Sequence, residues 1–381
     1  VQLRHDVVGL DASILSPPAV WEASGHLENF SDPLVDCKEC NERFREDQLE
    51  DLKTCPACDA KNSFTEARAF NLMFKTHAGP VEGAGHDVYL RPETAQGMFT
   101  NYKLVQETAR KKPPFGIAQI GKSFRNEITP GNFVFRTREF EQMEMEFFCK
   151  LDDTSKWLKY WCEQRMKWFE SLGIDKEKLR LRAHGSDELA HYSSACYDIE
   201  YKFDFGWSEL EGIADRGTFD LDQHIKASGK KLTYFDQVNN EHIVPAVVEA
   251  SAGVDRALLT ILADAFTKEE VNGESRTVLK LDPKIAPIKV AVFPLMNKNN
   301  MPEISQKIVE DIRISGIASF YDSGGSIGKR YRRQDEAGTP FGITVDHDTL
   351  EDNTVTIRDR DTMHQERISI DKIVDVLKNK L

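Results

Sequence analysis

The segment Phe115-Gly-Ile-Ala-Gln-Ile-Gly-Lys-Ser-Phe-Arg-Asn-Glu127, followed after a short loop by Phe135-Arg-Thr-Arg-Glu-Phe-Glu-Gln-Met-Glu-Met-Glu-Phe-Phe148, is the most informative part of this chain. Both runs have the pattern of a β-strand, and the loop between them contains Pro130-Gly131, which predicts a hairpin. Successive side chains of a strand point to opposite faces. The second run therefore presents Phe140, Gln142, Glu144 and Glu146 on one face, and Glu141, Met143, Met145 and Phe147 on the other.

The two faces of this second run predict different environments. Methionine and phenylalanine are typical of a core. The other face carries an aromatic ring, an amide and acids, with Arg136 and Arg138 at its entry. Such a face can stack a base, hold phosphates and bind an ammonium group. The alternative is an ordinary hairpin whose charges point into solvent.

Composition sets the bounds for this interpretation. With 381 residues the chain is long enough for two or three domains, and 40% hydrophobic with 30% charged residues is typical of a soluble globular protein. No apolar run approaches the ~20 residues that span a bilayer, so no membrane association is expected. A net charge of −13 argues against non-specific coating of nucleic acid. The start, Val1-Gln-Leu-Arg-His-Asp6, resembles neither a signal peptide nor an initiator segment, and we expect it to lie inside a longer gene product.

Seven cysteines, an odd number, do not indicate a disulfide framework and favour a reducing cytoplasm. Four of them form two C-x-x-C pairs separated by fourteen residues: Cys37, Cys40, Cys55 and Cys58. Four thiolates at this spacing predict a structural zinc ion with no open coordination position. Two redox pairs, or unrelated buried thiols, are the alternatives. We expect the other three, Cys149, Cys162 and Cys196, to serve packing only.

One short run is strongly basic despite the acidic total: Lys329-Arg330-Tyr331-Arg332-Arg333. A charge run of this kind is often a solvated surface. The interleaved tyrosine could stack on a base, so a nucleic-acid-binding patch is an equal alternative.

Turn residues and periodicity divide the chain into two parts. Residues 1–36 predict mixed strand and loop, 37–62 the zinc knuckle, and 67–148 mostly strand, interrupted by a helix at Thr94–Lys111. The stiff segment Asp282–Pro287 is the predicted domain boundary, giving domains at 1–282 and 286–381. Further helices and strands are expected at Ser155–Leu172 (helix), Arg180–Arg182, Ala195–Phe203, Gly206–Ala214 and Val244–Ala252 (strands), and Ala257–Phe266 (helix). Beyond residue 286, strands alternate with helices, which predicts a small α/β domain.

Three motifs resemble those of the homodimeric, bacterial-type class II glycyl-tRNA synthetases: Leu90-Arg-Pro-Glu-Thr-Ala-Gln-Gly97, Phe124-Arg-Asn-Glu127, and Glu249-Ala-Ser-Ala-Gly-Val-Asp-Arg256. Asp11–His26 and the C-terminal part fit the same family, so the resemblance covers essentially the whole chain. It implies an α+β fold with an antiparallel catalytic sheet flanked by helices, a zinc-knuckle insertion and a C-terminal α/β anticodon-binding domain. The family's first motif begins with a long helix at the dimer interface. Only its tail, ending near Pro18, is expected here, so we expect the family's N-terminal portion to be missing from this sequence.

The resemblance also implies a reaction. Glycine and ATP would form glycyl-adenylate with Mg²⁺, and the glycyl group would pass to the 3′ end of tRNA(Gly) in the cytoplasm. Both steps develop negative charge, so positioned cations should provide much of the catalysis. The implied catalytic residues are Arg125, Arg256 and Glu209.

The implied roles in ATP binding follow the motifs residue by residue. Arg125 would contact the α-phosphate and the substrate carboxylate, Arg256 the γ-phosphate, and Glu127 the adenine amino group, with Phe140 stacked on the base. Glu209, and with it Glu249, would offer oxygens to Mg²⁺. The full ATP-binding set is Arg125, Asn126, Glu127, Phe135, Arg136, Thr137, Arg138, Glu139, Phe140, Glu209, Leu210, Gly253, Val254, Asp255 and Arg256.

Glycine has no side chain, so its pocket must bind the ammonium group and exclude larger residues. We expect Glu93, Glu144 and Glu249 to surround the ammonium, with Ser251 and Arg216 closing the site. The full glycine-binding set is Arg45, Glu93, Phe140, Glu141, Gln142, Met143, Glu144, Arg216, Glu249, Ala250, Ser251, Ala252 and Gly253. The expected tRNA contacts are Lys329, Arg330, Arg332 and Arg333.

Three other functions are alternatives to this one. A non-catalytic module of the same fold, such as the accessory subunit of a mitochondrial DNA polymerase, would lose the phosphate-binding arginines, which are present here. A zinc-ribbon nucleic-acid binder leaves the acidic face unexplained. A related enzyme that charges serine, threonine or proline is the closest enzymatic alternative.

Overall fold

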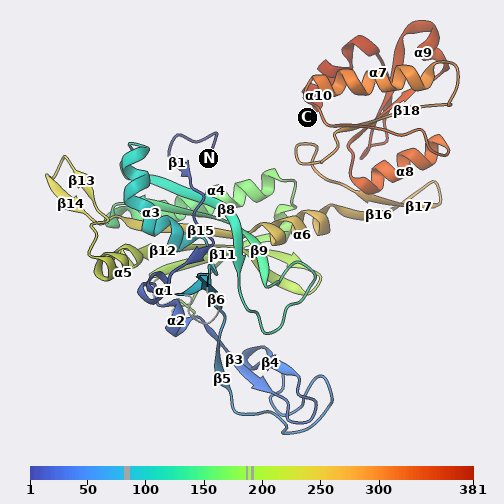
Figure 1. Cartoon of the computed structure of the whole chain (residues 1–381). Helices are drawn as coiled ribbons and strands as arrows, with labels where there is room; N and C mark the ends of the chain where they lie inside the picture. The colour runs from blue at the N-terminus through green and yellow to red at the C-terminus, as the bar shows by residue number, and fades with distance from the viewer. Residues whose placement is uncertain (81–85, 186–187, 190–192) are drawn as a thin grey trace. The chain divides into compact units, whose positions relative to one another are not determined.

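The computed structural model describes residues 1–80, 86–185, 188–189 and 193–381 (Figure 1). It forms two compact units. The first comprises Val1–Met166 and Leu179–Leu259, and the second comprises Lys167–Lys178 and Thr260–Leu381. The chain passes between them within helices α4 (Thr154–Ser171) and α6 (Val254–Ala265). The boundary between the two units lies earlier in the chain than the one expected at Asp282–Pro287, because the β-hairpin that follows α6 belongs to the second unit.

A seven-stranded sheet forms the centre of the first unit (Figure 1). Its order is β1 (Val7–Gly9), β8 (Phe115–Phe124), β9 (Glu139–Cys149), β15 (Ala246–Gly253), β12 (Gly206–Gly217), β11 (Ala195–Phe203) and β10 (Leu179–Ala183). All neighbours are antiparallel except β1 and β8. The expected hairpin is therefore β8 and β9, and the expected antiparallel sheet is confirmed.

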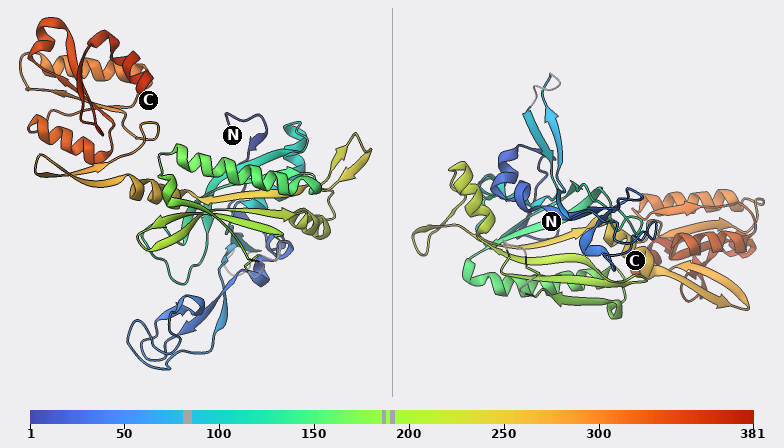
Figure 2. Two further views of the ribbon diagram at one scale, coloured as in Figure 1. Left: turned by 180° about the vertical axis from the view of Figure 1, so that it is seen from behind. Right: turned by 90° about the horizontal axis from the view of Figure 1, so that it is seen from below.

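The two faces of β9 are covered by different helices. Phe147 packs on Trp157 and Trp161 of α4, with ring centroids 4.6 and 5.3 Å apart, and α4 lies along that face of the sheet in Figure 2. Phe148 packs on Tyr102 of α3 (Ala95–Thr108) at 4.5 Å on the other face. The methionine face, expected to be core, is so only in part: Phe147 is fully buried, whereas Met143 and Met145 are half-buried. On the acidic face of β9, α3 covers only the end of the strand near Phe148.

The N-terminal region corrects one expectation. Residues 1–36, predicted as strand and loop, also contain the helices α1 (Pro18–Ala23) and α2 (His26–Asn29). A helix begins at Pro18 where the tail of one was expected to end, because a proline at the first helical position is already in helical geometry. Two other short helices were not predicted: α5 (Phe219–Ser228) and α9 (His347–Asp352).

Two three-stranded sheets and the hairpin of β13 (Tyr234–Asp236) and β14 (Glu241–Ile243) complete the first unit. One consists of β2 (Leu15–Ser16), β7 (His86–Leu90) and β6 (Phe74–Ala78), and precedes α3 in the chain. The other consists of β4 (Arg43–Arg45), β3 (Ser31–Asp36) and β5 (Arg68–Asn71). This second sheet forms the base of the cysteine-containing segment, since Cys37 directly follows β3.

The second unit has a five-stranded sheet with the order β19 (Ser319–Tyr321), β18 (Val290–Pro294), β20 (Phe341–Val345), β21 (Thr354–Asp359) and β22 (Gln365–Ser369). The first three strands are parallel, as expected for an α/β domain. Its helices are α7 (Met301–Ile314), α8 (Ile327–Ala337), α9 and α10 (Ile373–Lys380). The hairpin of β16 (Phe266–Val271) and β17 (Glu274–Leu279) belongs to this unit. No helix in the described part of the chain is long and apolar enough to cross a membrane.

Candidate active site

Arg125 lies at the centre of the candidate active site. It follows β8, and its backbone N–H donates to Arg138 O at 2.9 Å, which closes the base of the hairpin loop. Its Nε donates to Pro92 O at 3.0 Å, and its guanidinium lies 5.4 Å from the ring centroids of both Phe30 and Phe140. These contacts leave other donors of the guanidinium available to a ligand. Two neighbouring cavities are both lined by Arg125.

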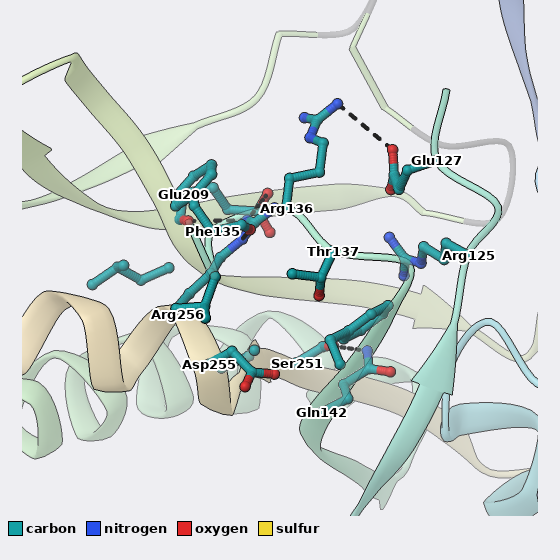
Figure 3. A pocket seen from close by; sticks show the side chains of 15 residues that line it. Arg125, Glu127, Phe135, Arg136, Thr137, Gln142, Glu209, Ser251, Asp255 and Arg256 are labelled. Atoms are coloured by element: carbon teal, nitrogen blue, oxygen red, sulfur yellow. Dashed lines mark hydrogen bonds and ion pairs between the residues drawn. The ribbon is translucent and has the colours of Figure 1, made fainter. Parts of the chain in front are cut away.

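Arg256 approaches the first cavity from α6. Its Nε donates to Phe135 O at 3.0 Å, and the guanidinium lies 4.3 Å from the Phe135 ring centroid. Its Nη1 donates to Glu209 O at 3.1 Å and lies 3.3 Å from the Glu209 carboxylate. Figure 3 shows Arg256 and Arg125 on opposite sides of Thr137. An anion bound between them would face the start of α6, where the helix dipole also favours negative charge.

The first cavity has an empty volume of about 620 Å³. It contains a third arginine, Arg136, whose Nη1 lies 3.8 Å from the Glu127 carboxylate (Figure 3). Most of the expected ATP-binding residues meet here. The lining residues are Arg125, Glu127, Val134, Phe135, Arg136, Thr137, Phe140, Gln142, Glu209, Leu210, Ser251, Ala252, Gly253, Asp255 and Arg256.

The second cavity is lined by carboxylates. Glu144 lies on β9, Glu249 lies on the adjacent strand β15, and Glu93 precedes α3. In the pairing of these strands Glu144 is opposite Ser251, and Glu249 is opposite Glu146. The expected acids around glycine therefore do meet on one face, because residues two apart on paired strands share a face.

Glu144 is held by three donors within this cavity. Its Oε2 accepts the backbone N–H of Thr94 at 2.9 Å and the Thr94 hydroxyl, and its Oε1 accepts Gln142 Nε2 at 3.1 Å. Burial, together with the charges of Glu249 and Glu93, raises the pKa of Glu144 to about 8. A bound cation would stabilise the ionised form.

Glu249 is paired with a buried arginine. Arg216 is 2% exposed; its Nη1 donates to Glu249 Oε2 at 2.6 Å and its Nε to Asp220 Oδ2 at 2.7 Å. Burial still raises the pKa of Glu249, while Arg216 opposes this rise. Arg216 therefore fixes the carboxylate and lies behind the cavity wall. It is not a lining residue of either cavity.

Glu146 lies behind these acids. It is 0% exposed, and both of its carboxyl oxygens lack a hydrogen-bond partner among the described residues. Burial, then the charges of Glu249 and Glu144, raises its pKa well above the usual value. A buried carboxyl without a partner is far more stable in its neutral form.

The pKa of Glu93 is shifted in the opposite direction from that of the other three acids. Burial disfavours its charge, but His26 at 3.3 Å, Arg216 and Gln96 outweigh burial and lower the pKa of Glu93. His26, Thr94 and Asp220 support the acids and were not predicted. A local signal existed for two of them, because Thr94 follows Glu93 in the quoted motif and Asp220 lies only four residues after Arg216.

Several expected site residues do not line either cavity. Arg45 pairs with Asp32 at 2.7 Å and with Asp47 beside β4. Arg138 donates to Glu127 O at 3.0 Å and positions the loop. Strand alternation explains others, since they occupy the second face of β9 or β15. The residues outside the cavity linings are Arg45, Asn126, Arg138, Glu139, Glu141, Met143, Arg216, Ala250 and Val254.

The four knuckle cysteines converge. Their Sγ atoms lie within 4.8 Å of one another, with Cys37–Cys58 and Cys40–Cys55 both at 3.7 Å. A tetrahedron with Zn–S bonds of about 2.3 Å has S–S edges of about 3.8 Å, so the donor set fits zinc. The Ser63 hydroxyl, 3.2 Å from Cys37 Sγ, lowers the pKa of Cys37 to about 6, which favours a thiolate.

The basic run lies on α8 and requires a correction. Arg330 is 3% exposed and its guanidinium donates to the carbonyls of Pro294, Ser323 and Gly325. The Tyr331 hydroxyl is 2.7 Å from Thr344 Oγ1, and the ring packs on Phe293. These two side chains serve packing and are not presented to a nucleic acid, because α8 turns them towards the sheet. Lys329 is exposed, and Arg333 binds Asp322.

Comparison with known proteins agrees with this geometry. The family model described as "tRNA synthetase class II core domain (G, H, P, S and T)" matches residues 74–265, and "Anticodon binding domain" matches residues 289–380. The sheet, the arginines and these two matches define a class II aminoacyl-tRNA synthetase.

Relatives define the family more narrowly. The chain is 54% identical to a glycine–tRNA ligase of Caldanaerobacter subterraneus subsp. tengcongensis, covering 98% of this chain and 86% of that protein. It is 50% identical to the glycine–tRNA ligases of Streptomyces coelicolor and Borreliella burgdorferi, covering 100% of this chain and 88% and 86% of theirs. The chain belongs to the glycine–tRNA ligase family, which confirms the predicted family, enzyme class and function.

Proposed function

We propose that the first cavity binds ATP, the second binds glycine, and Arg125 joins the two reactants. The observation that carries this assignment is that Arg125 lines both cavities. One side of it has arginines for phosphates, and the other has carboxylates for an ammonium group. A guanidinium at the junction contacts both the α-phosphate and the glycine carboxylate, and it stabilises the charge that develops between them.

The arginines supply most of the positioning. Arg256 holds the γ-phosphate from α6, and Arg136 can leave Glu127 for a phosphate, since their 3.8 Å contact is long. Glu127 then accepts a hydrogen bond from the adenine amino group, with the ring on Phe140. The glycine carboxylate is itself the nucleophile, so orientation and charge stabilisation suffice for this step.

Glu209 is the residue that fits Mg²⁺. Its side chain is 49% exposed and lines both cavities, so its oxygens can reach a metal on the phosphates. Glu249 is less suited to this role, because it lines the second cavity and is absent from the lining of the first, where the phosphates would bind. When bound, the metal would neutralise phosphate charge.

Glycine selectivity follows from the second cavity. Glu144, Glu249 and Glu93 bind the ammonium group, with Ser251 and Gln142 beside them. An added methyl group would gain only ~1–3 kcal/mol in a roomy apolar pocket. Here it would meet carboxylates that are fixed by Thr94 and Arg216, and this excludes larger amino acids.

The four cysteines hold a structural zinc ion, and Cys37→Ser should lower the zinc content from one ion per chain towards none. Elemental analysis of the purified protein measures this directly. Retention of a full zinc equivalent would contradict the assignment. The cavities are formed by other residues, so glycine activation should persist in the folded variant.

The second unit binds the tRNA anticodon region, with Lys329, Arg332 and Arg333 as the contacts of the basic run. The functional enzyme is a homodimer. Its location in the cytoplasm remains a prediction from the sequence.

Glycine-dependent exchange of labelled pyrophosphate into ATP tests the proposed function. Exchange with glycine, and none with alanine, serine or proline, is the expected result. Exchange with one of those three in place of glycine would overturn the substrate assignment.

A further inference from the structure

Part of the second cavity is lined by residues that neither ATP nor glycine requires. Cys196 and Asp198 lie two apart on β11, and therefore share a face. His184 directly follows β10, and its backbone N–H donates to Cys196 O at 3.0 Å. All three side chains line the cavity, and they are mounted on paired strands of the main sheet.

His184 and Asp198 form a close pair. His184 Nε2 lies 2.8 Å from Asp198 Oδ2, and Arg182 Nη2 contacts the same oxygen at 3.1 Å. Asp198 is buried, whereas His184 retains some exposure. The Nε2–Asp198 approach is an ion-pair contact without hydrogen-bond geometry, and among the described residues neither nitrogen of the His184 ring has a hydrogen-bond partner. This arrangement leaves Nδ1 for a further partner.

The wall of the cavity also extends beyond the groups assigned to glycine. Arg125 and the acids would fix the two ends of glycine, and His184, Cys196 and Asp198 form a further part of the wall. In the second half-reaction the terminal ribose of the tRNA would enter beside this part of the wall.

We propose, resting on the function proposed above, that His184 is the proton acceptor for the ribose hydroxyl in glycyl transfer, and that Asp198 positions it. The ribose oxygen forms the new ester bond to the glycyl carbonyl carbon, and the bond from this carbon to the phosphate oxygen breaks. AMP leaves as the phosphate anion, and the hydroxyl proton passes to Nδ1 of His184. Asp198 stabilises the resulting imidazolium.

The electrostatics of Asp198 support the pair. Burial and the charge of Glu209 raise the pKa of Asp198, and its contacts with His184 and Arg182 oppose this rise. A more basic carboxylate stabilises an adjacent imidazolium more strongly. Arg182, which also contacts Glu188 and Glu200, keeps the carboxylate in place.

The test separates the two half-reactions with His184→Asn, Asp198→Asn and a matched control, His242→Asn, at an exposed position of the β13 (Tyr234–Asp236) and β14 (Glu241–Ile243) hairpin. Glycine-dependent pyrophosphate exchange reports activation. Transfer from preformed glycyl-adenylate to tRNA in a single turnover reports the second step. A general base contributes about 10²–10⁴-fold, so we expect His184→Asn to slow transfer about 100-fold and exchange less than about 3-fold. Asp198→Asn should slow transfer less, and His242→Asn neither step.

A second variant, His184→Gly, tests whether His184 only shapes the wall of the cavity. Transfer should slow as much as in His184→Asn, and part of the transfer rate should return when imidazole is added. Equal losses in exchange and transfer, or unchanged transfer, would overturn the proposal. So would a second zinc ion per chain that disappears in His184→Asn, because His184, Cys196 and Asp198 would then be metal ligands. Absence of exchange in the unsubstituted enzyme would instead refute the proposed function.

Discussion

Two clusters of buried charge, one in each unit, differ in how completely their charges are paired. In the second unit, Asp335 accepts Arg276 at 2.9 Å and Arg358 at 3.0 Å, and Arg276 is 0% exposed. Arg360 donates to the carbonyls of Gly338 and Leu281. Every charge of this cluster has close partners.

The cluster in the first unit lacks this balance. Glu93, Glu144, Glu146 and Glu249 lie close together, and among the described residues Arg216, which also binds Asp220, is the arginine that forms an ion pair with one of them. Burial and mutual repulsion raise the pKa of Glu144 and Glu249. This difference indicates that a fully paired buried cluster holds helices and strands together, whereas an incompletely paired cluster is suited to a ligand of opposite charge.

The largest expected effect comes from breaking the paired cluster. Asp335→Ala leaves Arg276 and Arg358 buried without their carboxylate and should reduce the free energy of unfolding by about 3–5 kcal/mol. Urea unfolding followed by circular dichroism measures the loss. Asp348→Ala, at an exposed acid of the same unit, should change stability by less than about 0.5 kcal/mol. A loss below about 1 kcal/mol for Asp335→Ala would show that the pairing is not important for stability.

Neutralising an acid of the unpaired cluster should affect glycine instead. Glu144→Gln keeps the shape of the side chain and removes the charge that faces the ammonium group. We expect the KM for glycine in pyrophosphate exchange to rise about 100-fold, equivalent to ~2.7 kcal/mol, with the KM for ATP within about 3-fold. Glu163→Gln, the same change at an exposed position of α4, is the control. Similar increases for both substrates would contradict the glycine-binding role.

The pH dependence of stability provides another test of the incompletely paired cluster. The pKa of Glu144 is raised in the folded state, to about 8, so its contribution to stability is complete below the unfolded pKa and declines as the pH rises towards 8. Between pH 6 and 9 the ligand-free enzyme should lose about 2 kcal/mol through this group. Thermal unfolding at several pH values should show this slope, and Glu144→Gln should flatten it. Equal slopes in the two proteins would refute the electrostatic explanation.

The smallest effect is expected on α8. Replacing Lys329 and Arg332 by serine should raise the KM for tRNA by about 3–10-fold, because each cation contributes a screened phosphate contact. Pyrophosphate exchange should not change. Arg330→Ser is the contrasting variant, since it removes a buried guanidinium that donates to three backbone carbonyls and should lower stability. A change in exchange for the double variant would indicate that the patch is structural.

Local pattern was sufficient for much of the fold. Alternation along residues 139–149 correctly grouped the acids on one face of the strand, although that face is more buried than the methionine face. The C-x-x-C spacing correctly predicted that four thiols lie close together. The helices α1, α5 and α9 were missed because short helices carry little periodicity. The buried position of Arg330 was missed because a run of like charges does not reveal which side faces a sheet.

The residue types that do chemistry, their order on each strand and the family motifs that contain them could all be read from the sequence. Which charges are paired became visible only in the folded chain. Arg216 lies behind Glu249, Glu146 is buried with no hydrogen-bond partner among the described residues, and His184 contacts Asp198 of the neighbouring strand. Such pairing depends on register and burial, because the electrostatic energy of a carboxylate is set by its solvation and by neighbours that are distant in the chain.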